Sequence, residues 1–337
     1  MTWRAPGRLA VALAVASLAV GACSSAATPA PTSAPASAAP TSAAPSAAKT
    51  YTIGSVIWNT SIPFYTNLIK GEKDGAAKYG MNIDLQNGNG DLSGQIAVIQ
   101  QFIAKKVDLI LVSPSDPEGI APVIKQANDA GIPVISVNST VGKSAQVVTY
   151  VGADDYEFGQ KQGEMLAKAF PNGASVGYIL GHLGVSAQTL REQGLMDYLN
   201  NYPNIKIITK QSADWDNAKA LAITQDWLNK YPKGSIDAIV DQGPEGATGA
   251  KYAYDNGRPE IKFMMGDYPA DVKTGIEAGY IYGTVDQDPY PQGTTAVDMA
   301  YYWLTGQKDK VPTPQLYLPL PIVTKDNVSQ YPAAWGG

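Results

Sequence analysis

From Thr50 onward, the chain alternates short runs of β-forming residues with longer segments of helical periodicity, and this alternation constrains its fold most. The pattern is typical of parallel sheets whose strands are connected by helices. The first half offers strands at residues 51–57, 81–86, 107–112, 133–137 and 147–151, and the second at 174–180, 205–209, 236–241, 261–265 and 281–285. Two similar halves predict an α/β protein with two Rossmann-like lobes rather than one eightfold barrel.

Residues 63–79 form the clearest predicted helix. Pro63 stands in its first turn, and Gly80 follows its end, where a left-handed cap is favoured. In open parallel sheets, ligands bind beside the loops at the carboxyl ends of the strands. We therefore expect the functional residues in those loops.

The first 22 residues have the pattern of a signal peptide. Two arginines precede an apolar run over 9–20, which is shorter than the roughly 20 residues of a membrane-spanning helix. The closing sequence Val20-Gly21-Ala22-Cys23 resembles a bacterial lipobox, in which the cysteine becomes the lipidated first residue. The alternative is an ordinary cleavable signal with an incidental cysteine.

Residues 23–49 are predicted to be the lipidated cysteine and a disordered tether. Every residue from Ser24 to Ala48 is Ser, Ala, Thr or Pro, a composition that cannot bury enough apolar surface to fold. We therefore expect an extracytoplasmic protein that Cys23 anchors to the outer face of the cell membrane.

Composition excludes several classes of function. The net charge is -5, and loss of Arg4 and Arg8 with the signal leaves 23 basic against 30 acidic residues, which disfavours a nucleic-acid partner. A single histidine, His182, and a single cysteine exclude a His/Cys zinc cluster and an intrachain disulfide. They also leave few routes to nucleophilic catalysis, so we expect no enzyme and no cofactor.

Three aromatic residues follow the first predicted strand: Trp58 in the loop, and Phe64 and Tyr65 at the start of the helix. Aromatic faces pack against the C–H faces of a sugar ring, while polar neighbours hold its hydroxyls. The alternative is that Phe64 and Tyr65 only face the core from the first helical turn.

Seven short motifs occur in a fixed order along the folded part: Ile62-Pro63-Phe64-Tyr65; Ala130-Gly131-Ile132-Pro133-Val134-Ile135; Val151-Gly152-Ala153-Asp154-Asp155; Leu190-Arg191-Glu192-Gln193-Gly194; Ala213-Asp214-Trp215-Asp216; Gly266-Asp267; and Thr284-Val285-Asp286-Gln287-Asp288-Pro289. With this ordered set, the chain from Thr50 onward resembles the periplasmic sugar-binding proteins of the ribose-binding type. Those proteins serve ABC importers and share their core with LacI-type repressors. A repressor role is not expected, because the signal and tether stand where a DNA-binding headpiece would be.

The resemblance implies the type I periplasmic-binding-protein fold, with two lobes joined by a multi-strand hinge. The N-terminal lobe would comprise residues 50–153 and 288–317, and the C-terminal lobe residues 154–287 and 318–337. One ligand would lie between the lobes. Phe64, Tyr65 and Trp215 would stack on it, Arg191 would donate to its oxygens, Asp267 would be the main acceptor, and Gln287 would donate and accept.

Three positions depart from the family pattern. Asn138-Ser139 stand where an Asp-Arg pair is common, Gly243 where asparagine is frequent, and Trp58 where a small polar residue is usual. We expect these residues to border the ligand. Compared with the family pattern, they should give the site fewer hydrogen-bonding groups and more apolar surface. A site that lacks a hydroxyl-directed group does not penalise a ligand without that hydroxyl, so a small neutral sugar, polyol or cyclitol other than ribose is expected.

Several polar residues keep a second interpretation. Arg191 could be a surface residue, and Asp267 could cap the helix near Pro269. His182 could border the cleft or be a bystander. The acid pairs Asp154-Asp155 and Asp286-Asp288 would serve as caps or hinge bonds. The oxygen-rich run 87–91 lacks the glutamate that a calcium loop needs at its twelfth position, so no metal site is expected and Asp91 should begin a helix.

The predicted function is that of a monomeric solute-binding lipoprotein that captures its ligand by hinge closure and delivers it to an ABC permease. One alternative is a sensor that presents the ligand to a membrane receptor. Another is an extracellular carbohydrate hydrolase. That enzyme needs two carboxylates about 5 to 10 Å apart, and the sequence places Asp267 in the cleft and offers Asp241 as the other candidate.

Overall fold

The computed structural model describes residues 49–336. The predicted signal peptide, Cys23 and the predicted tether up to Ala48 lie outside the described residues. Within 49–336, no helix combines the length and the apolar character that crossing a membrane requires.

The first sheet has six strands, and every neighbouring pair is parallel. Its spatial order is β11 (Gln315–Tyr317), β5 (Tyr150–Gly152), β4 (Val134–Val137), β3 (Leu109–Ser113), β1 (Thr52–Ile57) and β2 (Asn82–Asn87). The strands β3 and β4 are buried throughout. Their uninterrupted apolar runs suit central strands that helices cover on both faces.

The second sheet repeats this arrangement. Its spatial order is β12 (Ile322–Thr324), β10 (Gly283–Val285), β9 (Lys262–Gly266), β8 (Ala238–Asp241), β6 (Ala174–Leu180) and β7 (Ile205–Ser212). Only β12 is antiparallel to its neighbour. In both sheets the first five strands follow the doubly wound order 2-1-3-4-5. The predicted α/β class with two Rossmann-like lobes is confirmed.

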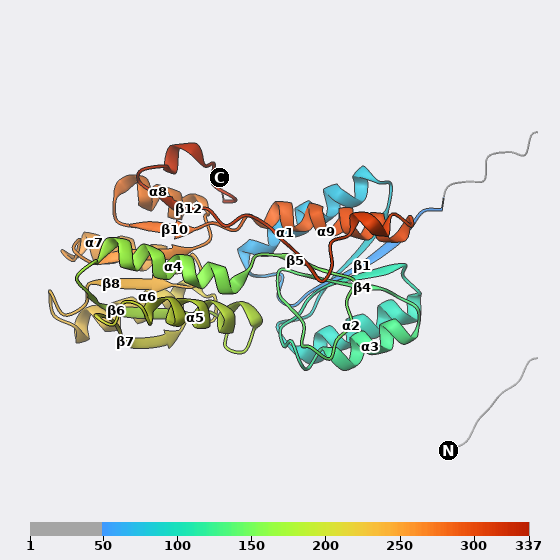
Figure 1. The fold of residues 1–337 in the computed structure, drawn as a ribbon, viewed down its shortest axis with the longest axis horizontal. Coiled ribbons are helices and arrows are strands. Elements are labelled where there is room, and N and C mark those ends of the chain that lie inside the picture. The colour runs from blue at the N-terminus through green and yellow to red at the C-terminus, as the bar shows by residue number, and fades with distance from the viewer. Residues whose placement is uncertain (1–48, 337) are drawn as a thin grey trace, which may run out of the picture. The chain divides into compact units, whose positions relative to one another are not determined.

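Helices cover both faces of each sheet (Figure 1). The first sheet packs against α1 (Pro63–Lys78) and α9 (Pro289–Leu304) on one face and α2 (Leu92–Lys105) and α3 (Ala121–Asp129) on the other. The second packs against α4 (Asp155–Ala169) and α5 (Ser186–Leu199) on one face and α6 (Asn217–Lys230), α7 (Ala247–Asp255) and α8 (Ala270–Ala278) on the other. Two short 3₁₀ turns, η1 (Lys308–Lys310) and η2 (Val328–Gln330), complete the described elements.

Local sequence rules explain the ends of these helices. Helix α1 begins at Pro63, and Gly80 has a φ of +63° just past its end, as predicted. Asp91 caps α2, because its side chain accepts a hydrogen bond from the Gly94 N–H at 2.7 Å. This bond confirms that Asp91 begins a helix.

The chain passes between the two sheets after β5, after β10 and after β11. At the first two crossings an aspartate caps the next helix: Asp154 accepts from the Tyr156 and Glu157 N–H groups, and Asp288 accepts from that of Tyr290. The capping interpretation is thus confirmed for these two acids. The exact lobe boundaries stay a prediction.

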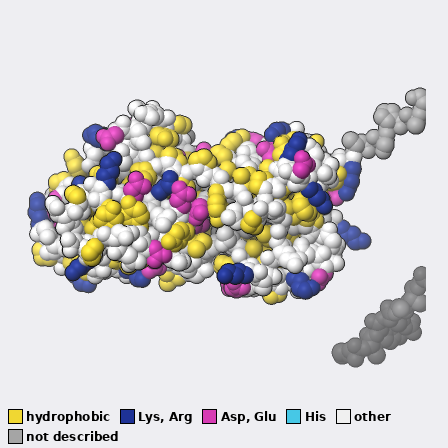
Figure 2. Space-filling model, viewed as in Figure 1, with side chains coloured by type: hydrophobic (Ala, Val, Ile, Leu, Met, Phe, Trp, Pro, Cys, Tyr) yellow, Lys and Arg dark blue, Asp and Glu magenta, His cyan; other side chains and the backbone are white. Residues whose placement is uncertain are grey.

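Surface charges of both signs are interspersed on the face shown in Figure 2. Exposed acids lie beside lysines, as in the Lys125–Asp129 pair at 2.7 Å and the Lys251–Asp255 pair at 2.6 Å. Such exposed pairs contribute little to stability, about 0–1 kcal/mol each.

Candidate functional site

A cavity of about 320 Å³ lies where the carboxyl ends of the two sheets' strands meet. This volume is at the lower end of the range for small-molecule sites, about 300–1,000 Å³. Nine of the ten residues predicted to bind a ligand line it: Trp58, Phe64, Tyr65, Asn138, Ser139, Arg191, Trp215, Asp267 and Gln287. The structure therefore brings residues from both sheets to one place. That they hold a ligand stays a prediction.

The aromatic residues from the first sheet form one wall. Trp58, Phe64 and Tyr65 are all less than 9% exposed and belong to the apolar core beneath α1. The Trp58 indole N–H donates to the Tyr65 hydroxyl at 2.7 Å, and the Phe64 and Tyr65 rings meet edge to face at 5.5 Å. Phe64 and Tyr65 face the core, as the alternative interpretation expected, and both also line the cavity. Their stacking on a ligand stays a prediction.

Trp215 comes from the second sheet, in the loop after β7. Its φ is +60°, a left-handed conformation that is uncommon for a bulky residue. Its indole lies directly over Gly181: a Cβ at that glycine would be 1.9 Å from Trp215 Cζ2. The absence of a side chain at Gly181 is therefore what gives the indole its place.

A chain of hydrogen bonds runs from the aromatic wall to Asp267. The Tyr65 hydroxyl donates to Asn138 Oδ1 at 3.1 Å, and Asn138 Nδ2 donates to Gln292 Oε1 at 3.2 Å. Gln292 Nε2 then donates to Gln287 Oε1 at 3.2 Å, and Gln287 Nε2 donates to Asp267 Oδ1 at 2.8 Å. This chain of hydrogen bonds links residues of the two sheets. Each amide in it holds the next in place, because a buried network whose hydrogen bonds are satisfied is rigid.

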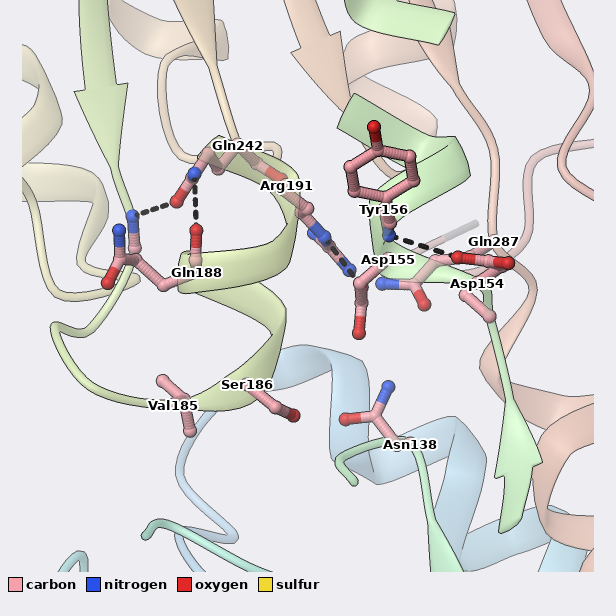
Figure 3. Close-up of polar contacts among 12 residues, drawn as sticks. Asn138, Asp154, Asp155, Tyr156, Val185, Ser186, Gln188, Arg191, Gln242 and Gln287 are labelled. Carbon is pink, nitrogen blue, oxygen red and sulfur yellow. Dashed lines mark hydrogen bonds and ion pairs between the residues drawn. The ribbon is translucent and has the colours of Figure 1, made fainter. Parts of the chain in front are cut away.

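Arg191 is deeply buried, so its interpretation as a surface residue is wrong. Its side chain is 3% exposed, and its Nε donates to Asp155 Oδ1 at 2.9 Å. Its Nη1 donates to the Gln242 backbone oxygen at 2.7 Å. Figure 3 shows the Arg191 guanidinium reaching toward Asp155, with Gln242 above it in this view. A guanidinium carries five N–H donors, and these two bonds use two of them. The remaining N–H groups can donate to a ligand.

Close packing of α4 on α5 brings Arg191 to Asp155. A Cβ at Gly159 would be 2.0 Å from the Arg191 backbone oxygen, and one at Gly194 would be 2.0 Å from that of Tyr156. Only glycine at both positions permits this approach, and the approach fixes the geometry of the ion pair.

Asp267 does not cap α8, because the residue at that cap is Pro269. It has a φ of +61° in the loop after β9 and is 5% exposed. Burial raises its pKa to about 6, although the nearby Arg191 charge opposes the rise. A buried carboxylate at the cavity wall can accept hydrogen bonds from hydroxyl groups.

Gly243 is the predicted site residue that does not line the cavity, and Glu245 lines it instead. A Cβ at Gly243 would be 2.2 Å from Glu245 Oε2, so this carboxylate lies where a side chain at 243 would begin. The expected loss of hydrogen-bonding groups at this position is wrong. The sequence did contain an indication of this group, because Glu245 stands two residues after Gly243 in the loop that follows β8.

Trp335 is a second residue of the cavity wall that sequence reasoning missed. It is 9% exposed, and its ring meets Phe64 edge to face at 5.5 Å. The Ala270 N–H donates to the Trp335 backbone oxygen at 2.9 Å, which ties the segment to the second sheet's side. No local pattern in the sequence indicated that this segment returns to the site.

Contacts across the two sheets also occur outside the cavity wall. The Trp58 and His182 rings lie 5.3 Å apart, and the Thr140 N–H donates to Ser186 Oγ at 2.9 Å. His182 Nδ1 is 3.6 Å from Asp214 Oδ1. Among the described residues, His182 does not line the cavity, but its ring contacts Trp58, which does.

Comparisons with known proteins agree with this architecture. The curated ribose import binding protein RbsB of Bacillus subtilis is 29% identical over 260 residues, which cover 77% of this chain and 84% of that protein. The xylitol-binding protein of Mycolicibacterium smegmatis is 27% identical, covering 83% of this chain and 78% of that protein. A Bacillus halodurans ABC transporter solute-binding protein, solved with bound myo-inositol, superimposes with a TM-score of 0.77 at 27% identity, covering 83% of this chain and 96% of that one. A family model for the periplasmic binding protein domain matches residues 53–308, and the chain therefore belongs to this family.

Proposed function

We propose that this protein captures a small sugar or polyol in the cavity between its lobes and delivers it to an ABC permease. The observation that supports this most strongly is the convergence of nine predicted ligand residues, from both sheets, on one cavity. Relatives that bind ribose, xylitol or myo-inositol support the same ligand class.

The chemistry of the cavity supports this ligand class. Aromatic side chains stand on both lobes, Trp58 and Phe64 on one and Trp215 on the other. Such faces cover the C–H groups of a ring or chain, while Arg191 and Asp267 supply a donor and an acceptor for its oxygens. Each lobe alone holds only part of this set, so ligand binding favours the closed arrangement.

A thermal-shift screen over pentoses, hexoses, polyols and inositols tests the proposal. A ligand that binds only the folded state stabilises it by about 2.7 kcal/mol at a hundred times its dissociation constant. Asp267→Ala should abolish the shift, whereas Asp255→Ala, which removes an exposed carboxylate from the same lobe, should leave it unchanged. A full shift in Asp267→Ala would contradict the role given to that carboxylate.

Hinge closure predicts a smaller radius of gyration with ligand than without it, measured by small-angle X-ray scattering. Equal values for a ligand that calorimetry shows to bind would contradict closure.

Anchoring and delivery need cellular tests. Cys23→Ala should move the protein from the membrane fraction to the medium. Deletion of the gene that encodes this protein should abolish cellular uptake of the labelled ligand. Uptake that persists while a ligand-dependent response is lost would favour a sensor instead.

A further inference from the structure

Glu245 is a residue of the cavity wall that the proposed function leaves without a role. It is 6% exposed, and its Oε2 has no hydrogen-bond partner among the described residues. A buried carboxylate is costly unless it is paired, because burial removes the water that stabilises its charge. The protein supplies no such partner within the described part of the chain.

The structure makes room for this carboxylate through Gly243. A Cβ at position 243 would lie 2.2 Å from Glu245 Oε2, so any larger residue there would displace the acid. The Gly243 N–H is itself bonded to Asp241 Oδ1 at 3.1 Å, which fixes the loop after β8. The absence of a side chain at Gly243 therefore allows the Glu245 carboxyl group to occupy this part of the cavity wall.

The charges around Glu245 are unbalanced. Among the described residues that line the cavity, Arg191 is the only Lys or Arg, and its Nε is already paired with Asp155. Asp267 lines the same cavity and shares the Arg191 charge with Glu245. Burial, together with repulsion from Asp241, raises the pKa of Glu245 well above its usual range, so the acid keeps its proton in the free protein and a cation beside it would favour the ionised form. Exposed carboxylates differ from Glu245 in this respect, because many of them lie beside the ammonium group of a lysine (Figure 2).

We propose, given the function proposed above, that the ligand is an amino-substituted sugar or polyol whose protonated amine is bound by Glu245. An ammonium group offers three donors and one positive charge, which match an unpaired carboxylate in an acidic cavity. Its hydroxyl groups face Asp267 and Arg191, and its carbon skeleton lies between the aromatic walls.

Matched pairs of compounds test this inference: glucose and glucosamine, galactose and galactosamine, glycerol and 2-amino-1,3-propanediol, and a cyclitol with its monoamino derivative. Melting temperature ranks them, and calorimetry gives dissociation constants at pH 7. At least one amino compound should bind more tightly than its neutral partner, by about tenfold or more, since a charge-assisted hydrogen bond is worth that factor.

Two variants assign the preference to Glu245. Glu245→Gln keeps the shape and removes the charge, and Gly243→Ala places a methyl group where the carboxylate lies. Both should lose the preference for the amine, with a smaller effect on the neutral partner. Glu164→Gln, which removes one exposed charge from the same lobe, should keep it. Unchanged far-ultraviolet circular dichroism shows that each variant is folded.

The outcomes separate the two proposals. Binding of neutral compounds alone, or an amine preference that survives in Glu245→Gln, would overturn this inference and leave the proposed function standing. Failure of every pair and of the whole sugar and polyol panel would overturn both.

Discussion

Replacing Trp335 by alanine should weaken ligand binding as well as the fold, by similar free energies. Trp335 is 9% exposed and lines the cavity, and its protein contacts include the edge-to-face pair with Phe64 at 5.5 Å. Deleting a fully enclosed tryptophan costs about 3–5 kcal/mol, but one side of this ring faces the cavity. The aromatic pair itself contributes about 0.5–1.5 kcal/mol.

The backbone bonds of this segment do not involve the indole. The Ala334 N–H donates to the Tyr268 oxygen at 2.8 Å, and the Ala270 N–H donates to the Trp335 oxygen at 2.9 Å, so the segment should stay in place. We expect a loss of about 1–2 kcal/mol in the free energy of unfolding, which corresponds to a fall in melting temperature of about 2–8 °C. Loss of an aromatic wall of the site should raise the ligand's dissociation constant about tenfold, or about 1.4 kcal/mol.

Differential scanning fluorimetry without ligand and titration calorimetry with the best compound of the screen measure the two effects. Trp303→Ala is the matched control, because Trp303 is a half-buried tryptophan on α9 that contacts Lys308 and does not line the cavity. A dissociation constant that is unchanged in Trp335→Ala, with a lower melting temperature, would show that the indole only supports the fold.

Three further substitutions test the energetics of the structure. Burial raises the pKa of Glu72 from 4.5 to about 8, so the folded state holds the proton more tightly and the free energy of unfolding falls as the pH rises between these values. Glu72→Gln should remove this fall, which amounts to about 3–4 kcal/mol between pH 5 and pH 8 in urea denaturation. The same fall in both proteins would contradict the assignment. Gly181→Ala should displace the Trp215 indole, which lies 1.9 Å from the added methyl position, and lower ligand affinity about tenfold in calorimetry, so an unchanged affinity would argue against stacking. Asp155→Asn should cost about 3 kcal/mol in chemical denaturation, because it leaves the buried Arg191 charge without its ion-pair partner, and a loss below about 1 kcal/mol would mean that other groups already balance that charge.

The local features of this fold could be predicted from the sequence. Apolar runs, helical periodicity and terminal residues such as Pro63, Gly80 and Asp91 act within a few residues of the backbone that they shape. Strand ends were less exact: β7 extends to Ser212, beyond the predicted residue 209, because edge pairing depends on the neighbouring strand.

Much of the candidate site could be found in the same way, since strand-end loops meet at one edge of a parallel sheet. Two informative exceptions are Gly243, whose place Glu245 occupies, and Trp335. Which side chain fills a gap depends on atoms that meet only in three dimensions.

The sequence by itself thus determined the α/β class, the two repeated halves and the loops in which function would lie, because these depend on short-range patterns. Only the tertiary structure decided how the site is charged and closed. It paired Arg191 with Asp155, left Glu245 without a partner and returned Trp335 to the cavity wall. The physical reason is that burial, charge balance and close contact are properties of groups brought together from distant parts of the chain.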